Sequence, residues 1–433
     1  MTADPAADLL RRLAEGPGAR LLDTLPPYDE RHALALQARL RADGHDPELV
    51  SAALTQSRLR TRGRDRLGPG VDDLLLTPDG LEQATRPGVA TRRAGRLART
   101  GVRHVLDLGC GLGLDAIAFA REGLEVTAVE RDPVVAAAAR ANLAPWPGAR
   151  VLTGDALAHP VGAGDGAFLD PARRVPGVAD ARGRTRRVRG LEGLSPSFEQ
   201  VQDVARRARA TVAKLGPSFD PRDVPAGADA EWVSLDGDLL ECALWWGAGP
   251  PRRRAVVGRT IRPGTATGCG GSEVAAVWEE VVEATDAPTP LEDPAGLLGH
   301  LAEVDDAVRA AGLTASLAAA VDGRETAAGT GYVTAAAPVD HPALRWFVVR
   351  EVLPLRPTVV RAWLREHHDP AGPVTLKKSG VRLDPEGFRR DLRLPRRTRG
   401  GDEVVLVLTT VAGSARALVV ERLGPPSPSA VEH

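Results

Sequence analysis

The stretch VLDLGCGLGLDAIAF, residues 105–119, decides the fold of this 433-residue chain. An apolar run carries Asp107 near its end, and glycines follow at positions 109, 111 and 113 before an Ala-rich segment. A strand that feeds a glycine turn and then a helix leaves backbone N–H groups and the positive end of the helix facing a ligand. Short β-rich runs alternate with Ala-rich stretches from about 100 to 260. This alternation predicts an α/β fold with a doubly wound sheet.

Changes in pattern along the chain divide it into five parts. Residues before the sheet carry apolar side chains at helical spacing between Gly and Pro, which predicts helices. The expected parts are an N-terminal helical region (1–95), the sheet domain (96–260), a linker or lid (261–290), an α+β domain (291–425) and a disordered tail (426–433).

Two local expectations refine this plan. The runs EWVSL (231–235) and LLECALWW (239–246) are joined by DGD and predict an antiparallel hairpin at the edge of the sheet. In the α+β domain, GLLGHLAEVDDAVRAAG (296–312) predicts a helix.

Composition and charge exclude several protein classes. The formal net charge is −1, so bulk charge indicates neither a nucleic-acid nor a membrane partner. There is no 18-residue apolar run, and the start MTADPAADLLRRLAEG lacks the pattern of a signal peptide, so we expect a soluble cytoplasmic protein. Three scattered cysteines, at 110, 242 and 269, predict neither a disulfide framework nor a metal site.

The glycine spacing discriminates between two nucleotide ligands. The dinucleotide motif requires Gly-x-Gly-x-x-Gly, and Leu114 stands where its third glycine should be. A carboxylate at Asp107 would also repel a pyrophosphate, whereas it suits a ligand that carries an amino group and a sulfonium. S-adenosylmethionine (SAM) is such a ligand.

The stretch resembles the first motif of class I SAM-dependent methyltransferases, acidic-x-Gly-x-Gly-x-Gly, at Asp107, Gly109, Gly111 and Gly113. The resemblance implies that Glu130, at the end of the second strand, binds the ribose hydroxyls. It implies that Asp155, after the third strand, contacts the adenine amino group. Asp115 lies one helical turn inside the loop, near the expected methionine end. A glycine turn in another α/β enzyme is the alternative, and three acidic strand ends in the right order argue against it.

The fourth strand ends in Asp170-Pro171, at the edge where doubly wound sheets keep their active sites. This pair resembles the (Asp/Asn)-Pro-Pro-aromatic motif of amino methyltransferases, in which the side chain and a proline carbonyl orient an amine. Ala172 and Arg173 replace the second proline and the aromatic residue. Either Arg173 or Phe198 would then have to stack on the base. An ordinary Asp-Pro turn is the alternative.

Basic residues follow the Asp-Pro pair directly. They either neutralise substrate phosphates at the mouth of the site or form a solvated loop, and the sequence leaves both open. The same choice applies to Lys214, on the fifth strand, which either contacts substrate or caps the strand end. The basic run comprises Arg173, Arg174, Arg182, Arg184, Arg186, Arg187 and Arg189.

The order of segments from about 50 to 425 resembles a bacterial group of class I methyltransferases with a C-terminal THUMP-like domain. The particular features are DPARR, KLGP and the EVLPLRPTVVRAWL…VTLKKSG tail. The resemblance implies methyl transfer to RNA and places Gln83 and Thr85 near the methionine end of SAM. Lys377 and Lys378 would contact phosphate or, alternatively, be exposed strand-end cations.

Three functions therefore remain. The first is methyl transfer to a base nitrogen of RNA, with RNA as partner and no membrane or metal partner. The second is a methyltransferase for a protein or small molecule, motivated by the missing aromatic residue. The third is a SAM-binding module without catalysis. The sequence leaves the methylated atom and the oligomeric state open.

Overall fold

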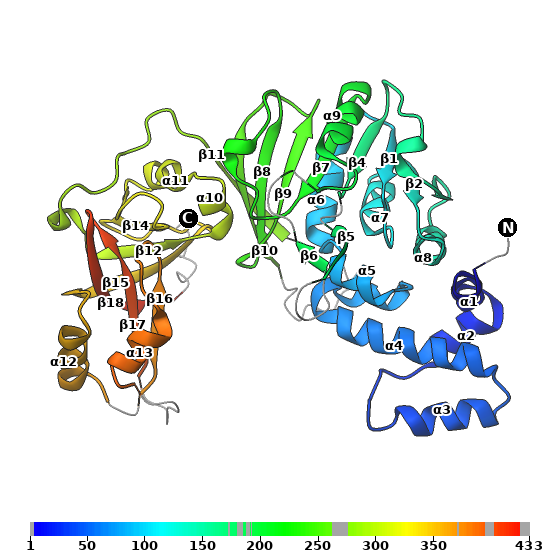
Figure 1. The fold of residues 1–433 in the computed structure, drawn as a ribbon, viewed down its shortest axis with the longest axis horizontal. Coiled ribbons are helices and arrows are strands. Elements are labelled where there is room, and N and C mark those ends of the chain that lie inside the picture. Colours follow the sequence, from blue (N-terminus) through cyan, green and yellow to red (C-terminus); the bar gives the residue numbers. More distant parts are fainter. Residues whose placement is uncertain are drawn as a thin grey trace, which may run out of the picture.

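The computed structural model describes residues 4–171, 174–179, 185–187, 191, 193–261, 276–369, 372–394 and 402–424, the side chains of 174–179 and 185–187 excepted. Two sheets with their helices lie side by side, and a helical region packs below one of them (Figure 1). The predicted tail, 426–433, and residues 262–275 of the predicted linker lie outside the described residues.

The larger sheet has nine strands in the order β11-β10-β8-β9-β7-β4-β1-β2-β3. Strands β3, β2, β1, β4 and β7 pair in parallel, which confirms the doubly wound sheet. The strand order reverses between β1 and β4, and in such sheets ligands bind at the carboxyl ends beside this point. The bounds are β1 (His104–Leu108), β2 (Glu125–Glu130), β3 (Ala149–Thr153), β4 (Gly166–Leu169), β7 (Ala210–Leu215), β8 (Asp229–Leu235), β9 (Asp238–Trp246), β10 (Arg253–Thr260) and β11 (Ala276–Val282).

Helices cover both faces of this sheet, so central strands such as β1 are buried almost throughout. One face packs against α6 (Pro87–Ala98), α7 (Leu114–Arg121) and α8 (Pro133–Leu143). The opposite face packs against α9 (Phe198–Arg207).

Two expectations about the far side of the sheet need correction. β8 and β9 form the predicted antiparallel hairpin, but β9 lies between β7 and β8, and β10 and β11 extend the sheet beyond them. Residues 276–282, expected in the linker, form β11 and pair with β10 along its length. A sequence pattern shows neither arrangement, because both depend on pairing with strands that are distant in the chain.

The N-terminal region is helical, as predicted, and shares a core with α8. Its anchor includes Asn142, the chain's single asparagine, which is buried. The Asn142 amide bonds to the backbone N–H and carbonyl of Leu75 and to the carbonyl of Leu112. The helices are α1 (Pro5–Ala14), α2 (Gly16–Thr24), α3 (Ala33–Ala42), α4 (Pro47–Leu67) and α5 (Pro78–Gln83).

The C-terminal domain is the predicted α+β unit, built on a seven-stranded sheet in the order β13-β14-β12-β15-β18-β17-β16. Its strands are β12 (His300–Val304), β13 (Arg324–Glu325), β14 (Tyr332–Ala335), β15 (Leu344–Pro354), β16 (Val374–Lys378), β17 (Val404–Val411) and β18 (Ser414–Arg422). Its helices are α10 (Asp306–Ala310), α11 (Thr314–Ala320), α12 (Pro357–His367) and α13 (Pro385–Asp391).

The helix predicted over 296–312 is wrong for its first half. Residues 300–304 form β12, which pairs with both β14 and β15, and α10 begins only after Asp305 caps it. Short apolar runs fit a strand and a helix equally well, so pairing with two neighbours decides the outcome.

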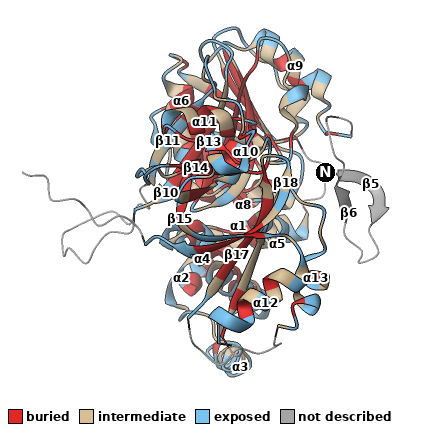
Figure 2. Cartoon of the chain, turned by 90° about the vertical axis from the view of Figure 1, so that its left-hand side faces the viewer, coloured by how far each residue is buried: buried red, intermediate tan, exposed pale blue. Residues whose placement is uncertain are grey.

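The two sheets share one hydrophobic core. Residues of α10 and α11, such as Val308 and Leu317, pack with Trp232 of β8 and Val257 of β10. These helices therefore cover the outer half of the nine-stranded sheet, and Figure 2 shows their buried residues in the middle of the molecule. The boundary predicted near residue 290 thus separates the two sheets but not their cores.

Candidate functional site

The glycine loop after β1 leaves an open space beside its backbone. Gly109, Gly111 and Gly113 have φ values of +96°, +54° and +80°, a region that favours glycine. A Cβ atom added at Gly109 or Gly111 would meet no atom within 4 Å, whereas one at Gly113 would lie 3.2 Å from Leu143 Cδ1. The first two glycines therefore border free space, and the third lets the loop pack on α8.

Asp107 is a buried carboxylate without a partner. It is fully buried in β1, and neither oxygen has a hydrogen-bond partner among the described residues. Burial raises its pKa well above the ordinary value, the carboxylates of Asp115 and Asp170 raise it further, and Arg93 opposes them. An unpaired buried charge is costly, so this site suits a cationic group that bonds to the carboxylate.

The acids after β2 and β3 lie at the same sheet edge, because the strands are parallel. Glu130 Oε2 accepts a hydrogen bond from Gly111 N at 3.1 Å, and Oε1 accepts one from Asp132 N at 2.8 Å. Glu130 therefore borders the glycine loop. Asp155 is exposed and accepts a hydrogen bond from Leu157 N at 3.0 Å, capping the short 3₁₀ helix Ala156–Ala158.

Asp115 is held by two residues that precede β1 in the chain. Its carboxylate accepts a hydrogen bond from Thr85 Oγ1 at 2.8 Å and pairs with Arg93. Arg93 also pairs with Glu241 Oε1 at 2.5 Å and lies 4.7 Å over the Phe168 ring. The sequence analysis missed Arg93 and Glu241. Arg93 lies four residues from both Val89 and Leu97, on the apolar face of α6, and that position was the available signal.

The end of β4 brings together two more predicted residues. Asp170 forms an ion pair with Lys214 of β7, and Pro171 is buried. Lys214 Nζ also lies 3.4 Å from Thr85 Oγ1. Burial lowers the pKa of Lys214, but the carboxylates of Asp170, Asp115 and Glu241 outweigh it and leave that pKa raised. A continuous series of polar contacts therefore links Asp170, through Lys214 and Thr85, to Asp115.

The described contacts do not join the other predicted residues of this region to that series. Gln83 is exposed at the end of α5, and Phe198 is half-buried against the core that includes Leu215. Arg173 lies outside the described residues. Arg174 belongs to β5 (Arg174–Ala179), while Arg186 and Arg187 belong to β6 (Thr185–Arg187), and the two strands pair. The side chains of these three arginines are outside the described residues.

The two C-terminal lysines differ from each other. Lys377 Nζ lies 2.7 and 2.6 Å from the two oxygens of Glu303, so its charge is paired. Lys378 is exposed and donates to the carbonyl of Leu383 at 3.0 Å.

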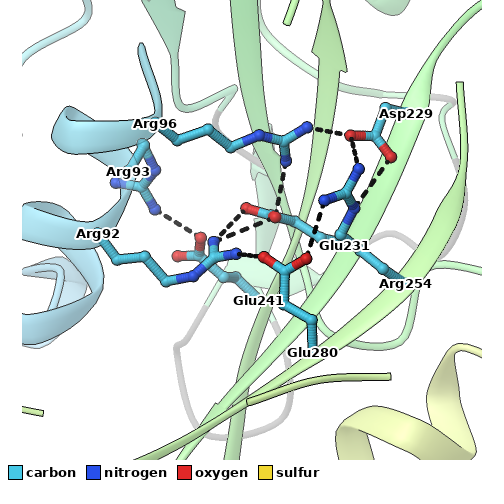
Figure 3. Close-up of polar contacts among 8 residues, drawn as sticks. All are labelled: Arg92, Arg93, Arg96, Asp229, Glu231, Glu241, Arg254 and Glu280. Atoms are coloured by element: carbon cyan, nitrogen blue, oxygen red, sulfur yellow. Dashed lines mark hydrogen bonds and ion pairs between the residues drawn. The ribbon is translucent and has the colours of Figure 1, made fainter. Parts of the chain in front are cut away.

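A layer of buried ion pairs fixes α6 against the far strands of the nine-stranded sheet (Figure 3). Arg92 of α6 pairs with Glu231 and Glu280, and Arg96 pairs with Glu231 and Asp229. Arg254 of β10 joins the same group through Asp229 and Glu280. The layer sets the position of α6 and thereby the reach of Arg93 toward Asp115.

The sequence matches three family models. Residues 105–169 match a methyltransferase domain, 344–422 a THUMP domain-like family and 6–63 a domain of unknown function. An uncharacterized S-adenosylmethionine-dependent methyltransferase of Mycobacterium tuberculosis is 29% identical over 405 residues, covering 90% of this chain and 99% of the relative. The chain is therefore similar over most of its length to a SAM-dependent methyltransferase, and its C-terminal part matches a THUMP domain-like family.

The architecture of nearly the whole chain recurs in a solved structure. A crystal structure from Porphyromonas gingivalis W83, described as a methyltransferase, has a TM-score of 0.65 and 21% sequence identity. It covers 92% of this chain and 99% of its own. The likeness therefore extends to the arrangement of the SAM-binding and C-terminal domains.

Two features are absent from the described part of the chain. No helix there is long and apolar enough to cross a membrane. No group of three or more His, Cys, Asp or Glu side chains in the described part of the chain is arranged to hold a metal ion.

Proposed function

We propose that this methyltransferase transfers the methyl group of SAM to a base nitrogen of RNA and that its THUMP-like domain helps to bind the substrate. The observation that carries the proposal is the Asp170-Pro171 pair, which lies at the carboxyl end of β4, the strand next to β1 and Asp107. The Arg-rich segment that includes β5 and β6 begins directly after this pair.

The residues around the glycine loop fit SAM. Asp107 has no partner among the described residues, and we assign it to the cationic methionine end. Gly109 and Gly111 leave room for the ligand beside the backbone. Glu130 supplies carboxylate oxygens for the ribose hydroxyls, and Asp155 accepts from the adenine amino group. Asp115, Thr85 and Gln83 line the approach to the methionine end, with Asp115 held in place by Arg93.

The acceptor side is built to orient an amine. When bound, SAM supplies an electrophilic methyl carbon whose bond to sulfur breaks as the bond to the acceptor nitrogen forms. The Asp170 carboxylate and the Pro171 carbonyl accept hydrogen bonds from the acceptor amine and direct its lone pair. Lys214 holds the Asp170 carboxylate through an ion pair. Orientation of this kind is the main contribution that protein groups make to a one-step displacement. The proton that the nitrogen sheds passes to water.

Methylation of a protein or small molecule is the second candidate. One observation favours it: Phe198, a residue that could stack on a base, packs instead against the core beside Leu215. In that case the arginines after Asp170 would meet an acidic group of another substrate.

The test uses purified full-length protein, methyl-labelled SAM and cell extract from a strain that lacks the gene. We expect label in RNA, lost after ribonuclease treatment, and a methylated base identified by mass spectrometry of nucleosides. Label in protein or in small molecules would support the second candidate and refute the first.

A variant pair tests the catalytic role. Asp170→Ala should lower methyl transfer by about 100-fold while SAM affinity, measured by calorimetry, stays unchanged. Asp203→Ala, on the exposed side of α9, is the matched control and should behave as wild type. Full biological activity of Asp170→Ala in the deletion strain would instead indicate a SAM-binding module without catalysis.

A further inference from the structure

Positive charge is concentrated in the THUMP-like domain. Residues 344–422 contain sixteen arginines and lysines and nine aspartates and glutamates, a net charge of +7, whereas the whole chain carries −1. The remainder of the chain is therefore net negative, at −8. Although the whole chain is nearly neutral, the THUMP-like domain carries a net positive charge, which favours binding of a polyanion.

Part of this charge lies on α12 without acidic partners. Arg356 and Arg365 are exposed, and neither has an ion-pair partner among the described residues. Arg361 donates only to a backbone carbonyl, that of Asp391, at 3.3 Å. By contrast, Arg350 and Arg422 in the same domain pair with Glu421 and Glu403. The α12 arginines therefore keep charges that no described carboxylate offsets.

The same helix carries a stacked aromatic pair. The rings of Trp363 and His367 lie 4.8 Å apart and 9° from parallel, and His367 Nδ1 lies 3.0 Å from the carbonyl of Trp363. His367 is exposed, whereas Trp363 is half-buried against the core beneath α12. The outer side of the His367 ring is thus a flat surface fixed in orientation by the indole behind it.

Helical spacing arranges these groups in two rows. Trp363 and His367 are four residues apart and share one side of α12, while Arg361 and Arg365 share another. Buried Val360 and Leu364 face the sheet between the rows. On the solvent side the rows are separated by the small exposed residues Thr358 and Ala362, with Glu366 the one acid of the helix.

We propose that the α12 surface, formed by Arg356, Arg361, Trp363, Arg365 and His367, binds an unpaired segment of the RNA substrate. The inference rests on the proposed RNA methyltransferase function and adds where and how the substrate docks. The arginines bind phosphates, and an unstacked base lies on the exposed face of His367. A double-stranded segment fits this surface less well, because its bases are already stacked on one another.

The position of the α12 surface defines its role. α12 packs on one face of the seven-stranded sheet, against β15, β17 and β18, at the end of the molecule away from the nine-stranded sheet (Figure 1). An RNA held there must be long enough, or folded suitably, to reach Asp170 as well. The α12 surface therefore selects substrates by their length and shape, and residues at the catalytic end select the base.

The experiment measures binding of the full-length protein to a labelled single-stranded oligouridylate by fluorescence anisotropy over a range of salt concentrations. Arg361→Gln/Arg365→Gln should weaken binding about 10-fold and reduce the salt slope by roughly 1.4, the value for two lost phosphate contacts on a single strand. His367→Ala should weaken binding roughly 5-fold or more with the salt slope unchanged, because it removes a stacking surface and no arginine–phosphate contact.

The matched control is Arg350→Gln/Arg422→Gln, which removes two arginines of the same domain that are already paired. Equal weakening by the control and the Arg361/Arg365 variant would overturn the inference, since bulk charge would then explain binding. Wild-type binding to polyglutamate as tight as to the RNA would also overturn it.

Measurements of methyl transfer distinguish a failure of the docking surface from a failure of the proposed function on which it rests. The α12 variants should raise the KM for RNA and leave kcat and SAM affinity unchanged. If wild-type protein methylates RNA and the variants show an unaltered KM, the docking surface is refuted and the function stands. If extract from the deletion strain shows no labelled RNA, the proposed function itself fails.

Discussion

Replacing Arg93 by methionine is the most direct test of how the cofactor side of the site is held together. The Arg93 side chain is 2% exposed, and its partners Asp115 and Glu241 are 10% and 6% exposed. Methionine retains much of the volume and removes the charge, so two buried carboxylates lose their cation. Removing one partner of a buried ion pair costs about 3–5 kcal/mol, because the other charge stays buried without compensation.

The assay is thermal unfolding, measured by differential scanning calorimetry. For a domain of this size each kcal/mol lowers Tm by about 2–4 °C, so Arg93→Met should lower the Tm of the SAM-binding domain by roughly 6–20 °C. The second variant, Arg93→Met/Glu241→Gln, should recover part of the loss, since it removes one of the two stranded charges.

Arg11→Met is the control, because Arg11 forms exposed pairs with Asp8 and Glu15 and should leave Tm unchanged within about 2 °C. If Arg93→Met shifted Tm no more than this control, the buried pairs would contribute nothing and the reasoning would be refuted.

Three further predictions concern the site itself. Burial and neighbouring carboxylates raise the pKa of Asp107 in the folded state. Its contribution to the stability of the fold is therefore fully present at low pH, where the side chain is protonated, and is lost as pH rises from about 4 through the raised pKa. Asp107→Asn should therefore raise Tm more at about pH 8 than at about pH 4, and it should weaken SAM binding in calorimetry. An equal change in Tm at both pH values would contradict this reasoning. Gly111→Ala places a Cβ in the open space beside the loop and forces alanine to adopt φ +54°. It should lower stability by about 1–2 kcal/mol and reduce SAM affinity. Unchanged SAM affinity would mean that SAM does not occupy this space. Lys214→Met leaves Asp170 without its ion-pair partner and should lower kcat on the order of 100-fold at unchanged SAM affinity. Lys214→Arg should recover part of the lost kcat. A change in SAM affinity alone would place Lys214 on the cofactor side.

The cofactor side of the site could be predicted from sequence because its signals are local. The glycine loop joins β1 directly to α7, and Glu130 follows the adjacent strand, so spacing along the chain translates into position at the sheet edge. The acceptor side was predicted less completely. Asp170 and Lys214 were singled out separately, but their ion pair requires β4 and β7 to be neighbours, which only strand order provides.

Some expectations could not be settled by sequence at all. Residues 300–304 carry a pattern compatible with a helix and form a strand, because β14 and β15 supply hydrogen-bond partners on both sides. Residues 276–282 follow a Gly-rich stretch whose composition predicts a linker. They nevertheless join the nine-stranded sheet by pairing with β10. In both places the free energy of pairing with distant strands outweighs a weak local preference.

The sequence by itself determined the glycine turn and the acids at the strand ends, because a strand, a glycine turn and a helix are specified by neighbouring residues. Only the tertiary structure decided that Arg93 joins Asp115 to Glu241, partners that are 22 and 148 residues away in the chain. Such buried pairs arise where packing excludes water from several charges at once, and no spacing along one segment reveals which distant charges will meet.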